Sequence, residues 1–299
     1  MTIARLFEAW IPRSGPCTLA WIRIVVAAQA LWILLSRDPA GVSAMPDVIW
    51  QDVLPEWKAR FLLVQGVPKL EFALWCLAII SMLCVLVGYR TRIFGIVGAL
   101  LLYHLAPLQA LMNVTTPWGK GLTIATLALV VLSCSPCEDR WSISAPRTDR
   151  PFQSYGWAAM LIRLFFAQIY LFSVVIRLRN VGWDWAKLET VRNHIFVFRL
   201  AEPSLDTPFN AFLVAHPVLC GVLAMGTFLF ELFFVVAVFV PFTRIPLAMA
   251  GVLFHTSLWL TLGFSFPNLP HFAMFLDFNG EAKAPRRVAG TSVPAWQVS

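Results

Sequence analysis

Runs of apolar residues long enough to cross a lipid bilayer recur along this chain of 299 residues. A helix that spans a bilayer needs about 20 mainly apolar residues, because each residue advances it by about 1.5 Å. Apolar side chains make up 59% of the chain and charged ones 13%, whereas soluble domains carry about 25% charged residues. A soluble domain of this size has no core for so many apolar side chains, so the sequence predicts an integral membrane protein.

The charge of the chain favours a membrane partner over nucleic acid. Lys and Arg total 23 against 16 Asp and Glu, a net charge of +7, and most of the basic residues lie in loops between apolar runs. Such loops face the anionic headgroups of a bilayer, so membrane lipids are predicted partners and nucleic acid is not. The same hydrophobicity excludes a secreted or cytosolic soluble enzyme.

The apolar runs predict an all-α, polytopic transmembrane bundle with seven or eight spans. Two long polar stretches, 36–66 and 177–207, are predicted to lie outside the hydrocarbon and to contain interfacial helices, one of them over 48–65. Residues 267–278, which contain proline and charge, predict a weak eighth span that is broken or partial. The seven other predicted spans are 19–35, 70–88, 93–112, 118–134, 157–176, 216–240 and 245–264.

The loop charges predict the orientation of the chain. Short loops weigh most in the positive-inside rule, and the short loop with Arg90 and Arg92 is strongly basic. We therefore expect both termini in the cytoplasm and the two long loops outside. The predicted parts are a cytoplasmic N-terminal segment (1–18), a transmembrane domain (19–278) and a cytoplasmic, disordered tail (279–299).

Five ionisable residues lie inside the predicted spans, namely Arg23, His104, Arg163, Glu231 and His255. Each costs roughly 2.5–3.5 kcal/mol on insertion scales, so such groups face the bundle interior. One interpretation is a structural ion pair of Glu231 with Arg23 or Arg163, with the histidines bonded to backbone carbonyls. The other is a polar cavity between helices. No metal site is predicted, because the histidines and the carboxylate share no ligand spacing on one helix.

Cys134 and Cys137 have the spacing of thiol oxidoreductases and lie at a predicted membrane edge, where a quinone could approach. The predicted orientation places them on the cytoplasmic side, where thiols stay reduced. No second cysteine pair follows in a long outside loop. A quinone-linked thiol oxidoreductase is therefore kept only as a second alternative.

Two cations lie beside two tryptophans in the stretch 177–185, where Arg177 and Arg179 precede Trp183 and Trp185. Cations beside aromatic rings at a helix end bind a lipid headgroup or an acidic substrate. The alternative is plain anchoring of the helix end in the membrane interface.

Short motifs along the chain, taken in order, resemble those of the HTTM family, the membrane domain shared by vitamin K-dependent gamma-carboxylases and many bacterial proteins. Their order runs from about residue 14 to 278, which covers most of the chain. The motifs are LAWIR at 19–23, GYRTR at 88–92, RWSI at 140–143, YLF at 170–172 followed by Trp183, FE at 230–231, TR at 243–244 and FH at 254–255.

The resemblance implies a helical bundle whose site opens toward the extracytoplasmic side. In the carboxylases a lysine seven residues beyond the tyrosine acts as a base toward reduced vitamin K, and here that position, counted from Tyr170, is Arg177. The family also has a partner histidine near the start of the fourth span, and the corresponding position here lies near Gly121, where this chain has no histidine. An arginine stays protonated and cannot take the proton, so gamma-carboxylation is not expected.

A bacterial branch with this membrane domain assists maturation of a secreted peptide toxin. By analogy we expect a bacterial inner-membrane protein that handles a secreted peptide or lipid-like substrate, with a quinone-like or lipid cofactor compatible with its site. No catalytic residue is assigned, and an enzymatic activity stays open. The alternative is a non-catalytic membrane subunit or scaffold of a larger complex. The expected cavity residues are Arg163, Tyr170, Arg177, Trp183, Glu231 and His255.

Overall fold

The structure, a computed structural model, is helical or irregular in the parts it describes, with no strand among them. The predicted interfacial helix 48–65 and the tail 279–299 lie outside the described residues, as do the first ten residues of the predicted N-terminal segment. The described residues are 11–36, 68–112, 118–144, 150–264, 266 and 268–278.

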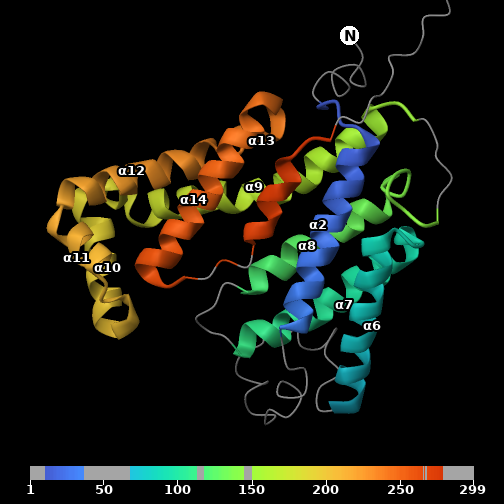
Figure 1. Cartoon of the computed structure of the whole chain (residues 1–299), viewed down its shortest axis with the longest axis horizontal. Helices are drawn as coiled ribbons and strands as arrows, with labels where there is room; N and C mark the ends of the chain where they lie inside the picture. The colour runs from blue at the N-terminus through green and yellow to red at the C-terminus, as the bar shows by residue number, and fades with distance from the viewer. Residues whose placement is uncertain are drawn as a thin grey trace, which may run out of the picture.

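Four helices form one half of the molecule, with α2 packed against α6 and α8, and α7 packed between α6 and α8 (Figure 1). Helix α2 is the most enclosed candidate span, because 67% of its apolar window is buried against 22% for α14. The four helices are α2 (Pro16–Leu35), α6 (Pro68–Val87), α7 (Thr91–Met112) and α8 (Trp118–Ser133).

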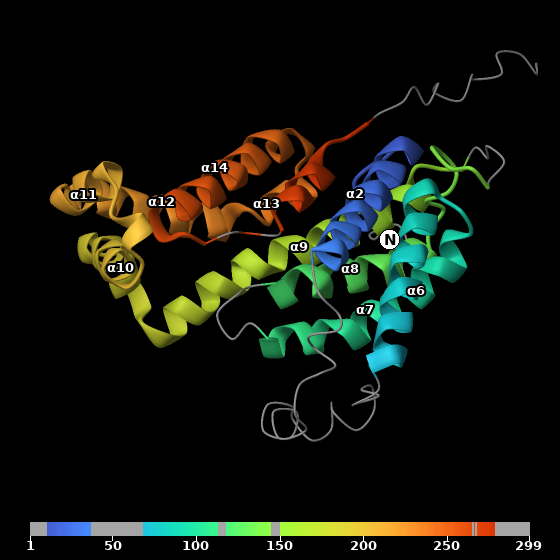
Figure 2. The ribbon, with the colours of Figure 1, turned by 60° about the horizontal axis from the view of Figure 1, so that its bottom comes forward.

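The long helix α9 leaves this half and carries the second one, in which α12 and α13 pack along it (Figure 2). Helix α10 packs on α12 at the far end, next to α11. The helices are α9 (Gln153–Asn180), α10 (Leu188–Ala201), α11 (Pro208–Ala215), α12 (Pro217–Phe233), α13 (Val236–Phe239) and α14 (Arg244–Leu262). Short 3₁₀ helices connect them: η1 (Gly182–Ala186), η2 (Pro203–Leu205), η3 (Pro241–Thr243) and η4 (Leu269–Phe275).

Five helices in the described part of the chain are long and apolar enough to cross a membrane. They are α2, α6, α9, α12 continued through α13, and α14. Helices α7 and α8 contribute shorter apolar segments, Thr91–Leu105 and Leu122–Ser133. The predicted all-helical membrane architecture is confirmed, and the count of seven or eight spans stays a prediction.

The segment 268–278, drawn in red beside α2, returns along α2 without forming an α-helix (Figure 1). Its centre is the seven-residue η4, which rises only about 2.0 Å per residue and is too short to span a bilayer. Three hydrogen bonds tie the segment antiparallel to α2: Gln29 Nε2 to Asn268 Oδ1 (3.4 Å), Trp21 Nε1 to the Ala273 carbonyl (2.7 Å) and Phe278 N to Thr18 Oγ1 (3.0 Å).

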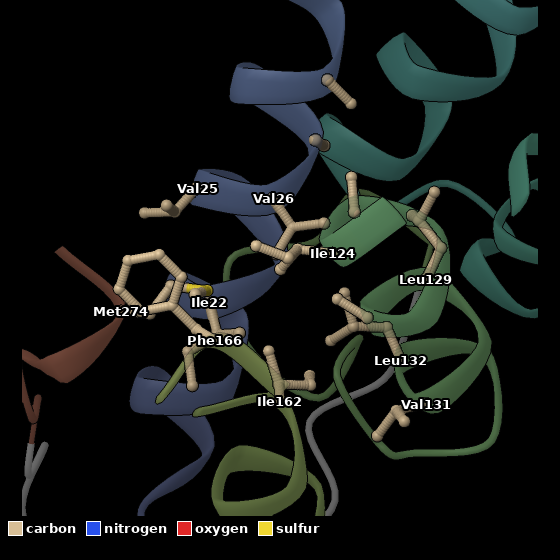
Figure 3. Close-up of a cluster of buried hydrophobic side chains, with 14 of the residues drawn as sticks. Ile22, Val25, Val26, Ile124, Leu129, Val131, Leu132, Ile162, Phe166 and Met274 are labelled. Carbon is tan, nitrogen blue, oxygen red and sulfur yellow. The ribbon is translucent and has the colours of Figure 1, made fainter. Parts of the chain in front are cut away.

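One continuous apolar core joins the two halves (Figure 3). Side chains from α2, α8, α9 and the η4 segment meet there, and Phe166 and Met274 lie beside Ile22 in the close-up. Because α9 contributes to this core and also carries the second half, its position fixes the relation between the halves.

Arg23 is fully buried at the end of the bundle where α2 begins. Its guanidinium donates to backbone carbonyls of the loop after α8, to Cys137 at 2.7 Å and also to Trp141. Gly88 makes room for it: a Cβ there would lie 2.7 Å from Ser142 Cβ and 2.8 Å from Arg23 Nη1. Three of the family-like motifs, at 19–23, 88–92 and 140–143, therefore meet in one structural cluster.

Replacing Gly88 by alanine tests this cluster. Gly88 has φ +73° in a crowded site, whereas Gly182 has φ +64° and a methyl group added there would find nothing within 4 Å. Both Gly→Ala changes carry a left-handed backbone penalty of about 1–2 kcal/mol, and only Gly88→Ala adds overpacking of about 1–3 kcal/mol. We expect Gly88→Ala to lower the Tm of the detergent-solubilised chain clearly more than Gly182→Ala. Equal shifts would contradict the proposed close packing.

Candidate functional site

Helix α9 carries Arg163, Tyr170 and Arg177 at intervals of seven residues. Seven residues are nearly two helical turns, so these side chains form one stripe with about 10 Å between neighbours. The helix ends at Asn180, and Gly182 beyond it takes a left-handed conformation. Arg177 and Arg179 lie in its last turn, where the helix dipole favours cations.

The middle of the stripe is a buried tyrosine and histidine pair. The Tyr170 hydroxyl lies 2.8 Å from Nε2 of His255 on α14, and both side chains are buried. The His255 ring stacks on Phe266 with centroids 3.6 Å apart, and its Nδ1 has no hydrogen-bond partner within the described structure. Further rings of Phe230, Phe234, Phe254 and Phe272 surround the pair.

The C-terminal end of the stripe is an ion pair between Arg177 and Glu231 of α12. The Glu231 side chain is 4% exposed and the Arg177 side chain 28%, so the pair borders solvent on the arginine side. The ring of Trp185 in η1 covers the guanidinium at 4.1 Å. We call Tyr170, Arg177, Glu231 and His255 the Tyr170 cluster.

Arg163 belongs to a different group, with Asp277 and Arg244, which we call the Asp277 cluster. Both arginines bind the Asp277 carboxylate, Arg163 at 2.8 Å. Both also donate to the backbone: Arg163 to the Met274 and Leu276 carbonyls (2.8 and 3.3 Å), and Arg244 to the Ala237 and Val238 carbonyls (3.1 and 3.2 Å). Nη1 of Arg163 has no hydrogen-bond partner in the described part of the chain.

Phe166 separates the two clusters. It lies on α9 between Arg163 and Tyr170, is fully buried, and packs edge-to-face on Tyr170 with centroids 5.5 Å apart. The Phe166 ring also stacks on the ring of His271 in η4, with centroids 5.3 Å apart. The structure thus brings together four of the six expected cavity residues and leaves Arg163 and Trp183 apart.

The predicted partner of Glu231 is wrong: it pairs with Arg177, and neither Arg23 nor Arg163 contacts it. The sequence-based span ends at residue 176 because the charged stretch begins there, but α9 continues to Asn180 and keeps Arg177 on its buried stripe. Arg23 and Arg163 instead have backbone carbonyls as main acceptors.

Two further predictions differ from the structure: Trp183 was expected in the cavity in place of Trp185, and Asp277 was not expected at a site. Trp183 is 69% exposed and packs on Phe228, whereas Trp185 covers Arg177. Asp277 carries the charge of its cluster, and the signal was present, because it is the one acidic residue in 267–278. His104, expected to bond a backbone carbonyl, pairs with Glu71 at 3.0 Å and links α7 to α6.

The two cysteines with redox spacing are both free thiols. Cys134 is exposed, while Cys137 is buried and donates from Sγ to the Leu132 carbonyl at 3.3 Å. Burial raises the pKa of the Cys137 thiol to about 11. A thiol with such a pKa stays protonated at neutral pH and is a poor nucleophile, which argues against the thiol oxidoreductase alternative.

The family model of the HTTM domain matches residues 15–279, nearly the whole of the described structure. No curated protein and no solved structure matches the chain significantly.

Glu231→Gln tests the pairing in the Tyr170 cluster. The amide keeps the shape but removes the charge, and water reaches Arg177 in part, so we expect a loss of about 1–3 kcal/mol in stability. In a double-mutant cycle with Arg177→Gln we expect coupling of about 0.5–3 kcal/mol. The matched cycle with Arg163→Gln should be additive. Coupling to Arg163 and none to Arg177 would contradict the observed pair.

Proposed function

Because this chain belongs to the HTTM domain family, we propose that it is a multi-pass membrane protein that handles a secreted peptide or lipid-like substrate at the Tyr170 cluster. The observation that supports this most is the exposure gradient along α9. Arg177 is partly exposed, Tyr170 is buried behind it, and Phe166 closes the stripe beyond. A substrate would therefore approach from the C-terminal end of α9 and meet a cation first.

We propose binding rather than gamma-carboxylation at this cluster. An arginine held by Glu231 and covered by Trp185 is a permanent cation, suited to an acidic or phosphate group and unable to act as a base. Tyr170 and His255 supply a hydroxyl and an imidazole for polar contacts deeper in the cluster. A quinone-like or lipid molecule is compatible with their aromatic surroundings, and no catalytic role is assigned.

For the location we propose the bacterial cytoplasmic membrane, with both termini inside and the cluster opening outward. Three segments meet at one end of the bundle: the start of α2, the loop 88–90 and the loop after α8. This agrees with the proposal, because two helices separate each of these segments from the next, and a chain that crosses a membrane twice returns to the same side. Counting α7 and α8 as crossings makes seven spans, with 268–278 as a broken eighth. We further propose that α10 and α11 lie in the interface, because Phe196 and Phe212 are exposed there.

The alternative of a non-catalytic subunit or scaffold has one supporting observation. Large apolar side chains are exposed along α6, α7, α12 and α14, and a partner complex could cover them as readily as lipid. The two proposals differ in the Tyr170 cluster, which a scaffold does not need.

Variants of Arg177 test the proposed binding. We expect the full chain, purified in native nanodiscs, to retain its lipid or peptide substrate in wild type and in Arg177→Lys. The Arg177→Ala variant should retain about tenfold less, because it loses a charged hydrogen bond of about 1.5–3 kcal/mol. Arg179→Ala is the matched control, since Arg179 is an exposed cation in the same helical turn. Mass spectrometry of the extracts measures retention. Equal retention by Arg177→Ala and Arg179→Ala would remove Arg177 from the site.

Cysteine labelling tests the proposed orientation. In a background without native cysteines, Lys187→Cys should react with an impermeant maleimide on intact cells, and Arg92→Cys only after permeabilisation. Arg92 is used because it is exposed, whereas neighbouring Thr91 is buried and its backbone N–H donates to Glu138. The reverse pattern would invert the orientation and direct the Tyr170 cluster toward the cytoplasm.

A further inference from the structure

Three buried polar side chains meet where the segment 268–278 begins to follow α2, and none belongs to the Tyr170 or Asp277 cluster. Gln29, Asn268 and His271 are each at most 2% exposed. Gln29 Nε2 donates to Asn268 Oδ1 at 3.4 Å, and the backbone N–H of His271 donates to the Asn268 carbonyl at 2.9 Å. The three residues therefore form one polar group inside an apolar domain.

Several donors and acceptors of this group lack a partner in the described part of the chain. They are Nδ2 of Asn268 and both ring nitrogens of His271. Each buried polar atom left unsatisfied costs about 1–3 kcal/mol, and native proteins leave few of them. Several such atoms on two residues joined by a backbone hydrogen bond indicate a molecule bound among them.

The chemistry of the unsatisfied atoms restricts what that molecule is. The His271 ring is fully buried, and burial disfavours the charged form of an imidazole, so one ring nitrogen donates and the other accepts. The Asn268 amide donates. The occupant must therefore both accept and donate hydrogen bonds, which a metal ion or a simple anion does not do, whereas water does both and is common at such positions.

We propose that Gln29, Asn268 and His271 form a buried hydration site that holds ordered water where the 3₁₀ helix η4 begins. Phe166, stacked on His271 at 5.3 Å, separates this site from the Tyr170 cluster. The hydration site is thus independent of the proposed function.

Pulsed X-ray radiolysis of the full chain in detergent tests the site, because hydroxyl radicals formed from bound water oxidise the side chains beside it. Met274 follows His271 by one 3₁₀ turn, whereas Met82 lies on α6, and both side chains are fully buried in the apolar core. We expect His271 and Met274 to be oxidised about tenfold faster than Met82, because only the polar site holds water. Equally slow oxidation of Met274 and Met82, with His271 unmodified, would overturn the proposal.

His271→Phe gives a second measurement, because phenylalanine keeps the ring stacked on Phe166 and removes both nitrogens. If water fills the site, the variant loses its hydrogen bonds, so we expect a lower Tm and slower oxidation of Met274. In a dry site the variant would remove two unsatisfied atoms, and a Tm that is unchanged or higher would overturn the proposal. Native mass spectrometry tests whether an organic molecule occupies the site instead of water. A molecule of fixed mass that is bound to wild type and lost in His271→Phe would overturn the proposal.

Discussion

Backbone carbonyls that leave an α-helix and are buried away from water need donors from the protein, because apolar surroundings offer none. Three fully buried arginines meet this need, and each serves a different break in the helical structure. Arg23 donates to the loop after α8, Arg244 to carbonyls of the short helix α13, and Arg163 to the segment 268–278, which is not α-helical. The irregular parts of the fold depend on these contacts, which supply donors to carbonyls of the segments between α2, α9 and α14.

This use of arginine also determines where chemistry can occur. Arg23, Arg163 and Arg244 are fully buried and each donates to two or more backbone carbonyls, whereas Arg177 binds the Glu231 carboxylate and borders solvent. A guanidinium at the edge of the bundle can exchange partners at low cost, and one fixed to several carbonyls cannot. We therefore propose substrate recognition at the Tyr170 cluster, whereas the Asp277 cluster connects α9, α14 and the segment 268–278 inside the fold.

Hydropathy predicted the helical membrane architecture and several helix positions well: the spans expected at 19–35 and 70–88 correspond closely to α2 and α6. It failed where charge and helix length disagree. A span predicted from apolar residues ends at residue 176. The helix α9 continues to Asn180, because basic side chains in the last turn of a helix stabilise it. The partners of the buried arginines were not predictable, because a hydropathy pattern does not say which carbonyls are left free. Tyr170, Arg177, Glu231 and His255 could be chosen from residue type and family motif, and their mutual contacts could not.

The acceptors of Arg23 lie far along the chain, the Cys137 carbonyl being 114 residues away. At a synthesis rate of roughly 5–20 residues per second, about 6–23 s pass between the synthesis of Arg23 and that of those carbonyls. Throughout that interval the first span carries a guanidinium without its final hydrogen bonds, at a cost of roughly 2.5–3.5 kcal/mol. The nascent first helix therefore has to be held by the insertion machinery, or stay near the headgroups, until the loop after α8 has emerged. Arg23 in the first span can thus form its final hydrogen bonds only after residues 137–141 have been synthesised.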